Sequence, residues 1–172
     1  LYGKERITIG FWVGGNVTPN KFSDYSDTDQ FKKKEFIRKL TKQIIKCPYC
    51  GKVITKDEYE INEKGKSVKI HCADSFCMFS KRSGRTIPVY LVDEEIYAKC
   101  PTVIISTVDK FARLPWTEQV GLIFGKTDRY CTRCGHIAIG QRHARRHNAD
   151  GAAGLEKAET VQCKPFYPPE LI

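Results

Sequence analysis

The 172-residue chain lacks several patterns that define common classes of protein. No apolar run approaches the roughly 18 to 20 residues needed to cross a bilayer, so no membrane partner is expected. A Gly-x4-Gly-Lys-Ser/Thr loop for nucleotide phosphates is absent, as are the His-Glu-x2-His and Gly-x-Ser-x-Gly motifs of metalloproteases and esterases. We therefore assign no catalytic residue to this chain.

A secretory signal is also missing, because residues 1–6 are charged and short of apolar side chains. We expect a reducing, cytoplasmic environment, in which the eight cysteines are metal ligands rather than disulfides. The net charge of +9 favours a polyanionic partner such as nucleic acid. The alternative reading of that charge is a solvated basic surface that aids solubility.

The apolar pattern predicts an α/β fold. Alternation over residues 7–13 predicts a strand, which runs into a Gly14-Gly15 turn where a ligand can approach the backbone. The continuous apolar run at 101–106 is typical of a strand buried on both faces of a parallel sheet. A helix is predicted from the four-residue spacing of Phe36, Leu40 and Ile44. Further strands are expected at 53–54, 68–70 and 87–92, and helices at 93–97, 108–114 and 117–124.

Four cysteines form two short turns with 21 residues between them, Cys47-x2-Cys50 and Cys72-x4-Cys77. This spacing is typical of the four-cysteine sites of zinc ribbons, because each turn offers two thiolates to one ion. Four thiolates leave no open position for catalysis. The sequence therefore predicts a structural zinc site, and free thiols are the alternative.

Cys131-x2-Cys134 opens a second candidate site. His147 follows Cys134 after 12 residues, a spacing seen in zinc fingers, whereas His143 follows after eight. We expect a second zinc held by Cys131, Cys134, His147 and Cys163. His143 is the substitute ligand, and a set of two cysteines and both histidines is also open. The alternative is that the histidines belong to a basic patch with Arg142, Arg145 and Arg146.

A carboxylate cluster and a single cysteine could suggest functional sites, but we interpret both as structural. Asp93-Glu94-Glu95 is a carboxylate cluster, which we interpret as the start of a helix because nothing near it in sequence completes an acid/base or magnesium site. Cys100 has no partner at metal spacing, so we expect a buried apolar thiol.

The order of these elements resembles the first motor domain of superfamily-two helicases, between its Gly-Gly motif and the strand bearing the DEAD/DEAH box. More closely, several short segments are similar to large bacterial helicases of the DISARM phage-defence type. Those segments are residues 9–14, 18–20, 93–97 and 101–112, together with the Cys47-Pro48-Tyr49-Cys50-Gly51 turn.

The resemblance implies a partial RecA-like motor domain with inserted zinc-ribbon modules. In that family the Gly-Gly turn and a Thr-Pro-Gly-Arg-like turn touch the sugar-phosphate backbone of nucleic acid. By resemblance, Gly14, Gly15, Thr107 and Lys110 contact nucleic acid, with DNA favoured over RNA. ATP and Mg²⁺ would bind the parent helicase outside this chain, so the isolated piece is expected to be inactive. Other partners implied are the rest of the helicase and proteins of a defence complex.

We expect the chain to be a fragment of a longer protein, since it starts without methionine and its last residues begin a new apolar run. The predicted segments are a motor strand and helix at 1–46, a zinc ribbon at 47–86, a motor strand and helices at 87–125, a second Cys/His insertion at 126–165, and the start of the DEAD/DEAH-box strand at 166–172. Two alternatives are a stand-alone zinc-ribbon module that binds nucleic acid and a protein-interaction scaffold.

Overall fold

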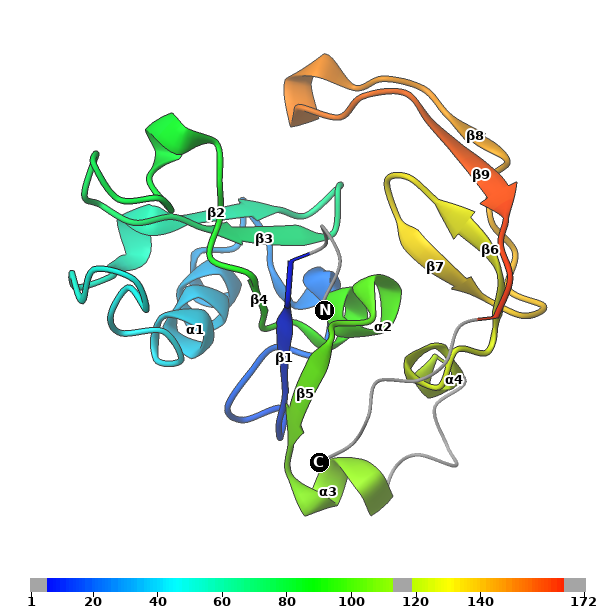
Figure 1. The fold of residues 1–172 in the computed structure, drawn as a ribbon, viewed down its shortest axis with the longest axis horizontal. Coiled ribbons are helices and arrows are strands. Elements are labelled where there is room, and N and C mark those ends of the chain that lie inside the picture. The colour runs from blue at the N-terminus through cyan, green and yellow to red at the C-terminus, as the bar shows by residue number, and fades with distance from the viewer. Residues whose placement is uncertain (1–5, 113–118, 166–172) are drawn as a thin grey trace.

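The computed structural model describes residues 6–112 and 119–165, which form a mixed α/β structure with three sheets (Figure 1). The first sheet is parallel, with strand order β4-β1-β5. Its members are β1 (Ile9–Trp12), β4 (Val89–Tyr90) and β5 (Val103–Ser106). β1 is central because the chain crosses from it to β4 on one side and from β4 to β5 on the other. The parallel pairing predicted for the apolar run at 101–106 is confirmed.

Helices α1 (Gln30–Thr41) and α2 (Asp93–Lys99) cover opposite faces of this sheet. α2 packs closely against Gly10, where an added Cβ would lie 2.7 Å from Pro101 and 3.3 Å from Ile96. Successive strand residues point to opposite faces, so Ile9 and Phe11 face the other way, towards the core that contains α1. Asp29 caps the start of α1, because its side chain accepts hydrogen bonds from the backbone N–H groups of Phe31 and Lys32.

β5 departs from its expected burial. Val103 is 44% exposed and Ile105 is 48% exposed, whereas burial on both faces was predicted. The reason is position: within the described residues β5 lies at the edge of the sheet, and α1 reaches only the other half of that face. An apolar hollow of about 500 Å³ continues this surface, lined in part by Ile9, Phe11 and Ile44.

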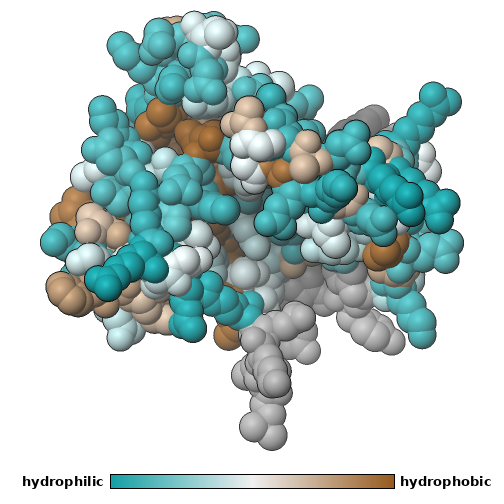
Figure 2. Space-filling model, turned by 90° about the horizontal axis from the view of Figure 1, so that it is seen from above, coloured by the Kyte–Doolittle hydropathy of each residue, from teal (hydrophilic) through white to brown (hydrophobic). Residues whose placement is uncertain are grey.

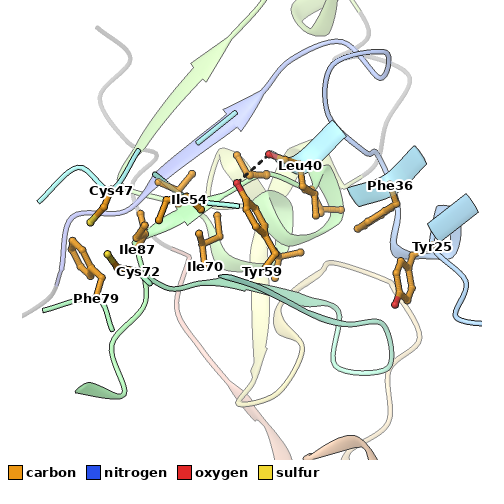
Figure 3. Close-up of a cluster of buried hydrophobic side chains, with 14 of the residues drawn as sticks. Tyr25, Phe36, Leu40, Cys47, Ile54, Tyr59, Ile70, Cys72, Phe79 and Ile87 are labelled. Carbon is orange, nitrogen blue, oxygen red and sulfur yellow. Dashed lines mark hydrogen bonds between the residues drawn. The ribbon is translucent and has the colours of Figure 1, made fainter. Parts of the chain in front are cut away.

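The first cysteine module shares one core with α1 (Figure 3). Its hairpin pairs β2 (Tyr59–Asn62) with β3 (Ser67–Ile70). Tyr59 points at the helix, and its hydroxyl donates to the carbonyls of Leu40 at 3.3 Å and Ile44 at 3.4 Å. The strand predicted at 53–54 is wrong as a hairpin strand, because Val53 makes only an isolated bridge to Lys46, across the base of the Cys47–Cys50 turn.

The second cysteine module is an antiparallel sheet with strand order β7-β6-β9-β8. These strands are β6 (Thr127–Cys131), β7 (Gly135–Ala138), β8 (Arg146–His147) and β9 (Ala158–Gln162). β7 packs on α2 and α4, and Figure 1 shows the β8–β9 arm arching back over the molecule. At its tip Asp150 forms an ion pair with Lys64 at 3.1 Å, so the two modules touch.

The remaining elements are short. They are α3 (Val108–Ala112), α4 (Val120–Ile123) and 3₁₀ turns at Phe22–Asp24, Lys56–Glu58, Lys81–Ser83 and Gly151–Ala153. Gly125 follows α4 at a φ of 71°, as expected for a helix stop. The strand start predicted at 166–172 lies outside the described residues. None of the helices in the described part of the chain is long and apolar enough to pass through a membrane.

Candidate metal centres and nucleic-acid interface

The first candidate metal centre joins two backbone turns at one end of the core. The structure brings together the Sγ atoms of Cys47, Cys50, Cys72 and Cys77, all within 4.8 Å of one another. Gly51, at a φ of 75°, closes the first turn, whose ends are joined by a hydrogen bond from the Cys47 N–H to the Lys52 carbonyl. Three of the sulfurs belong to buried residues, and Cys50 is exposed.

The spacing of these sulfurs fits a tetrahedral metal and not disulfides. Cys47 and Cys77 have sulfurs 3.7 Å apart, and those of Cys50 and Cys72 are 3.5 Å apart. A disulfide needs about 2.05 Å, whereas four sulfurs at about 2.3 Å from one zinc lie roughly 3.8 Å from each other. This group of four can therefore hold a metal ion.

Backbone donors surround the sulfurs of this group. The N–H groups of Asp74 and Phe79 each lie 3.4 Å from a sulfur, those of Cys72 and Cys77 respectively. Burial raises the pKa of Cys72 to about 12. In Cys47 burial acts in the same direction, but hydrogen bonds from the backbone of the turn outweigh it and lower the pKa. Four neighbouring thiols thus need a cation to be ionised together.

The second candidate metal centre lies between the β6–β7 turn and the segment that leads into β8. Its ligand atoms come from Cys131, Cys134, His143 and His147, again all within 4.8 Å of one another. Cys134 Sγ is 3.7 Å from His147 Nε2, and the Cys134 N–H lies 3.4 Å from the Cys131 sulfur. Two thiols and two imidazoles are a donor set that suits zinc.

The structure does not bring Cys163 into this group; His143 is there instead. The physical reason is strand register. β9 pairs antiparallel with β6 so that Thr160 lies opposite Cys131, and Cys163 donates its N–H to the carbonyl of Asp128. Asp128 is three positions from Cys131 along β6, or roughly 10 Å at the usual strand rise.

Histidine orientation in this group is set by the neighbouring strand. His143 Nδ1 lies 2.8 Å from the carbonyl of Ala144 and 3.1 Å from the hydroxyl of Thr160. A hydrogen bond from Nδ1 fixes the ring and leaves Nε2 as the nitrogen for a metal. The rings of His143 and His147 meet edge to face with their centroids 4.9 Å apart.

The predicted nucleic-acid residues meet at the carboxyl end of the parallel sheet. Gly14 and Gly15 follow β1, and Thr107 follows β5, where its N–H lies 3.4 Å from the carbonyl of Trp12. Thr107 is exposed. The space beside Gly15 is filled, because an added Cβ would lie 2.7 Å from the side-chain nitrogen of Asn20.

Lys110 lies differently from the other three, because it is buried rather than on the surface. Its ammonium donates to the carboxylate of Asp93 and, at 3.2 Å, to the side-chain oxygen of Asn20. A buried, paired ammonium is not open to a phosphate. The geometry therefore gives Lys110 a bracing position beneath the Gly14-Gly15 turn.

The three carboxylates at the start of α2 do more than begin a helix. Asp93 pairs with Lys110, and burial raises the pKa of Asp93. Glu94 accepts a hydrogen bond from the N–H of Phe22 at 2.7 Å. Glu95 is buried and accepts from the N–H of Val68, and burial raises its pKa to about 8. Sequence reasoning missed these roles because every partner lies on another element.

Cys100 lies apart from both cysteine groups. Its thiol donates to the carbonyls of Tyr97 at 3.1 Å and Leu122 at 3.4 Å, and burial raises its pKa to about 12.

The described residues thus define a mixed α/β chain with two Cys-rich groups, each able to hold a metal ion. No protein-family model matches the chain. Over 182 aligned residues it is 46% identical to the DISARM protein DrmA of Bacillus paralicheniformis, and the match takes in 99% of the chain. The chain spans 15% of the length of that relative.

Proposed function

We propose that this chain is part of the first motor domain of a cytoplasmic, DISARM-type phage-defence helicase, in which it grips the backbone of nucleic acid. The observation that carries the proposal is the meeting of Gly14-Gly15 and Thr107 at the ends of adjacent parallel strands. In open α/β sheets, ligands bind at the carboxyl ends of the strands. The likeness to the DISARM protein DrmA supports the assignment to phage defence.

Each residue at this edge has a distinct role in the proposal. Thr107 donates its hydroxyl to a phosphate, and Gly14 leaves the backbone accessible. Phosphate contacts give affinity that does not depend on sequence, which suits a protein that moves along a strand. Lys110 positions these loops from below, through Asn20 and Asp93, and makes no phosphate contact itself.

The two Cys-rich groups serve as structural zinc sites in this proposal. All ligand positions are filled by protein side chains, so the ion supplies folding stability and no chemistry. ATP and Mg²⁺ bind elsewhere in the longer protein, which carries the helicase activity. DNA is the favoured partner.

The first test is the coding sequence on both sides of the chain. A Gly-Lys-Thr loop encoded before Leu1 and an Asp-Glu-x-His box after Ile172 support the motor assignment, and unrelated sequence on both sides contradicts it. The second test is the ATPase rate of the longer protein with single-stranded DNA. Thr107→Ala should lower the stimulation by DNA, whereas Thr28→Ala, an exposed threonine on another loop, should not. Equal stimulation of both variants would rule out a role for Thr107.

A second candidate function is a protein-interaction scaffold, which the exposed apolar surface of β5 favours. Val103 and Ile105 are nearly half exposed, and the hollow beside Ile9 and Phe11 adjoins them. A defence-complex protein that covered this face would bind in a way that salt does not weaken, because apolar burial is unscreened. Salt-insensitive binding to a protein, with no affinity for DNA, would decide for the scaffold.

A further inference from the structure

The second cysteine module carries a groove on the surface beside its candidate metal centre. The groove has a volume of about 600 Å³ and is lined by Arg129, His143, Arg145, Arg146, Glu159, Thr160, Val161 and Gln162. We call it the arginine groove. Figure 2 shows that hydrophilic side chains predominate over the right half of the molecule, which holds this module.

Three guanidinium groups and one carboxylate give the groove a positive charge. Arg129 is fixed by hydrogen bonds to Gln141 at 2.7 Å and Asp128 at 3.2 Å. Arg146 pairs with Glu159 at 3.0 Å, but both side chains are more than 60% exposed, so water screens the pair and an incoming anion competes with it. Within the described part of the chain, Arg145 has no ion-pair partner and its side chain is exposed.

The candidate metal centre holds the wall of the groove. His143 and His147 both belong to the metal group, and Arg145 and Arg146 lie between them in the sequence. A metal that binds both histidines closes this short loop at its two ends. The backbone of the loop is also tied to β9, because the N–H of Thr160 donates to the carbonyl of Arg145 at 2.9 Å. The metal would therefore add two side-chain anchors, His143 and His147, to a loop that β9 already holds through its backbone, and it would fix the position of the two arginines further.

We propose that the arginine groove binds the phosphate backbone of nucleic acid and that its affinity depends on the metal in the second centre. The proposal rests on the nucleic-acid function proposed above and adds a second contact surface away from the strand ends. Arginine suits this task because its planar guanidinium matches phosphate in a two-pronged hydrogen bond. The basic loop of the first module at 81–85 is the control, because it follows the candidate ligand Cys77 but is not enclosed between two ligands.

The test is binding of the zinc-loaded 172-residue chain to a fluorescein-labelled 20-nucleotide DNA, followed by anisotropy from 50 to 300 mM salt. Arg145→Gln should weaken binding about five- to eight-fold at 0.1 M salt and reduce the salt slope by about one, as expected for one lost phosphate contact. Arg82→Gln, in the exposed loop of the first module, should leave affinity and slope unchanged.

A metal variant tests the coupling. His147→Ala should lose one zinc per chain and weaken binding at least as much as Arg145→Gln, which keeps both metals. Circular dichroism checks that each variant is folded. If Arg145→Gln or His147→Ala binds DNA with wild-type affinity, the inference is wrong while the proposed function stands. If Arg82→Gln loses as much affinity as Arg145→Gln, the inference is also wrong, because binding then depends on the overall positive charge and not on the groove. A wild-type chain that binds no DNA, or an acidic peptide more tightly than DNA, overturns both.

Discussion

The ammonium of Lys110 lies buried against the carboxylate of Asp93, and this ion pair ties α3 to the start of α2. The same ammonium holds the side chain of Asn20, which fills the space beside Gly15. One lysine therefore connects the three loops that follow β4, β1 and β5. These are the loops at which the parallel sheet presents its carboxyl edge.

Replacing Lys110 tests this bracing role. Lys110→Met should lower the free energy of unfolding by about 3–5 kcal/mol, because it leaves the buried carboxylate of Asp93 without its partner. Urea denaturation measures the loss. Lys64→Met removes a surface pair with Asp150 and should cost about 1 kcal/mol or less. Similar losses in the two variants would contradict the bracing role, and so would a lower salt slope for DNA binding in folded Lys110→Met.

Glu95 predicts a pH dependence of stability. Its pKa in the folded chain is about 8 because it is buried, against 4.5 for an ordinary glutamate. The folded state therefore binds the proton more tightly than the unfolded state, and stability falls as pH rises from 4.5 to 8. Glu95→Gln removes this fall, so its stability relative to wild type should rise by about 2–3 kcal/mol between pH 6 and pH 8. Thiol titrations affect both proteins equally, and a constant difference across that range would sink the prediction.

Zinc content distinguishes the ligand sets of the second centre. The wild-type chain should hold one zinc at each of its two groups. His143→Ala should lose the second zinc, and Cys163→Ser should keep both, because the Cys163 thiol lies 4.0 Å from the hydroxyl of Thr127 and outside the metal group. Mass spectrometry of the native protein counts the metals. The opposite pattern would show that Cys163 and not His143 is the ligand.

The metal in the four-cysteine centre should stabilise α1 as well as the two cysteine turns. Cys50→Ser should remove one zinc and also melt α1, because the hairpin and that helix share one hydrophobic core. Hydrogen exchange of the α1 amides reports this directly. Cys100→Ser, which lies outside both metal groups, is the matched control and should leave the α1 protection as it is.

Replacing Gly135 by alanine should destabilise the fold in two ways, by a steric clash and by a strained backbone, and Gly140 allows the two costs to be separated. An alanine Cβ there would lie 2.2 Å from the carbonyl oxygen of Ala98, and the residue has a φ of 86°. Gly140 has a φ of 81° with open space around it, so Gly140→Ala should cost only the roughly 1–2 kcal/mol of a left-handed alanine. Gly135→Ala should cost clearly more in thermal unfolding. Equal costs would mean that the contact with α2 relaxes freely.

Local patterns were enough to predict part of this architecture. The alternating residues of β1, the apolar run of β5 and the paired cysteine turns all depend on neighbours within a few positions. β2 was missed although Tyr59-Glu60-Ile61-Asn62 alternates between apolar and polar residues, because the alternation covers only four residues and charged residues lie on both sides of it.

The ligand set of the second centre could not be predicted from the sequence, because it depends on the register between strands. Whether His143 or Cys163 approaches Cys131 depends on how β9 aligns with β6, and that alignment is a property of the whole sheet. The ion pair of Lys110 with Asp93 likewise needs β5 and α2 to be placed first. From sequence alone Lys110 is interpreted as a surface contact, because nothing near it in the chain indicates that Asp93 is its buried partner.

The close approach of Gly135 to Ala98 has a mechanical consequence. Backbone touches backbone there, and Ala138 of β7 shares a core with Ile96 of α2, so no compliant layer separates the second module from that helix. Tension on a strand held in the arginine groove would reach α2 with little slack. Asp93, the first residue of α2, would transmit the force to Lys110 through their ion pair. A force on the second cysteine module would therefore displace the loops at the carboxyl edge of the parallel sheet.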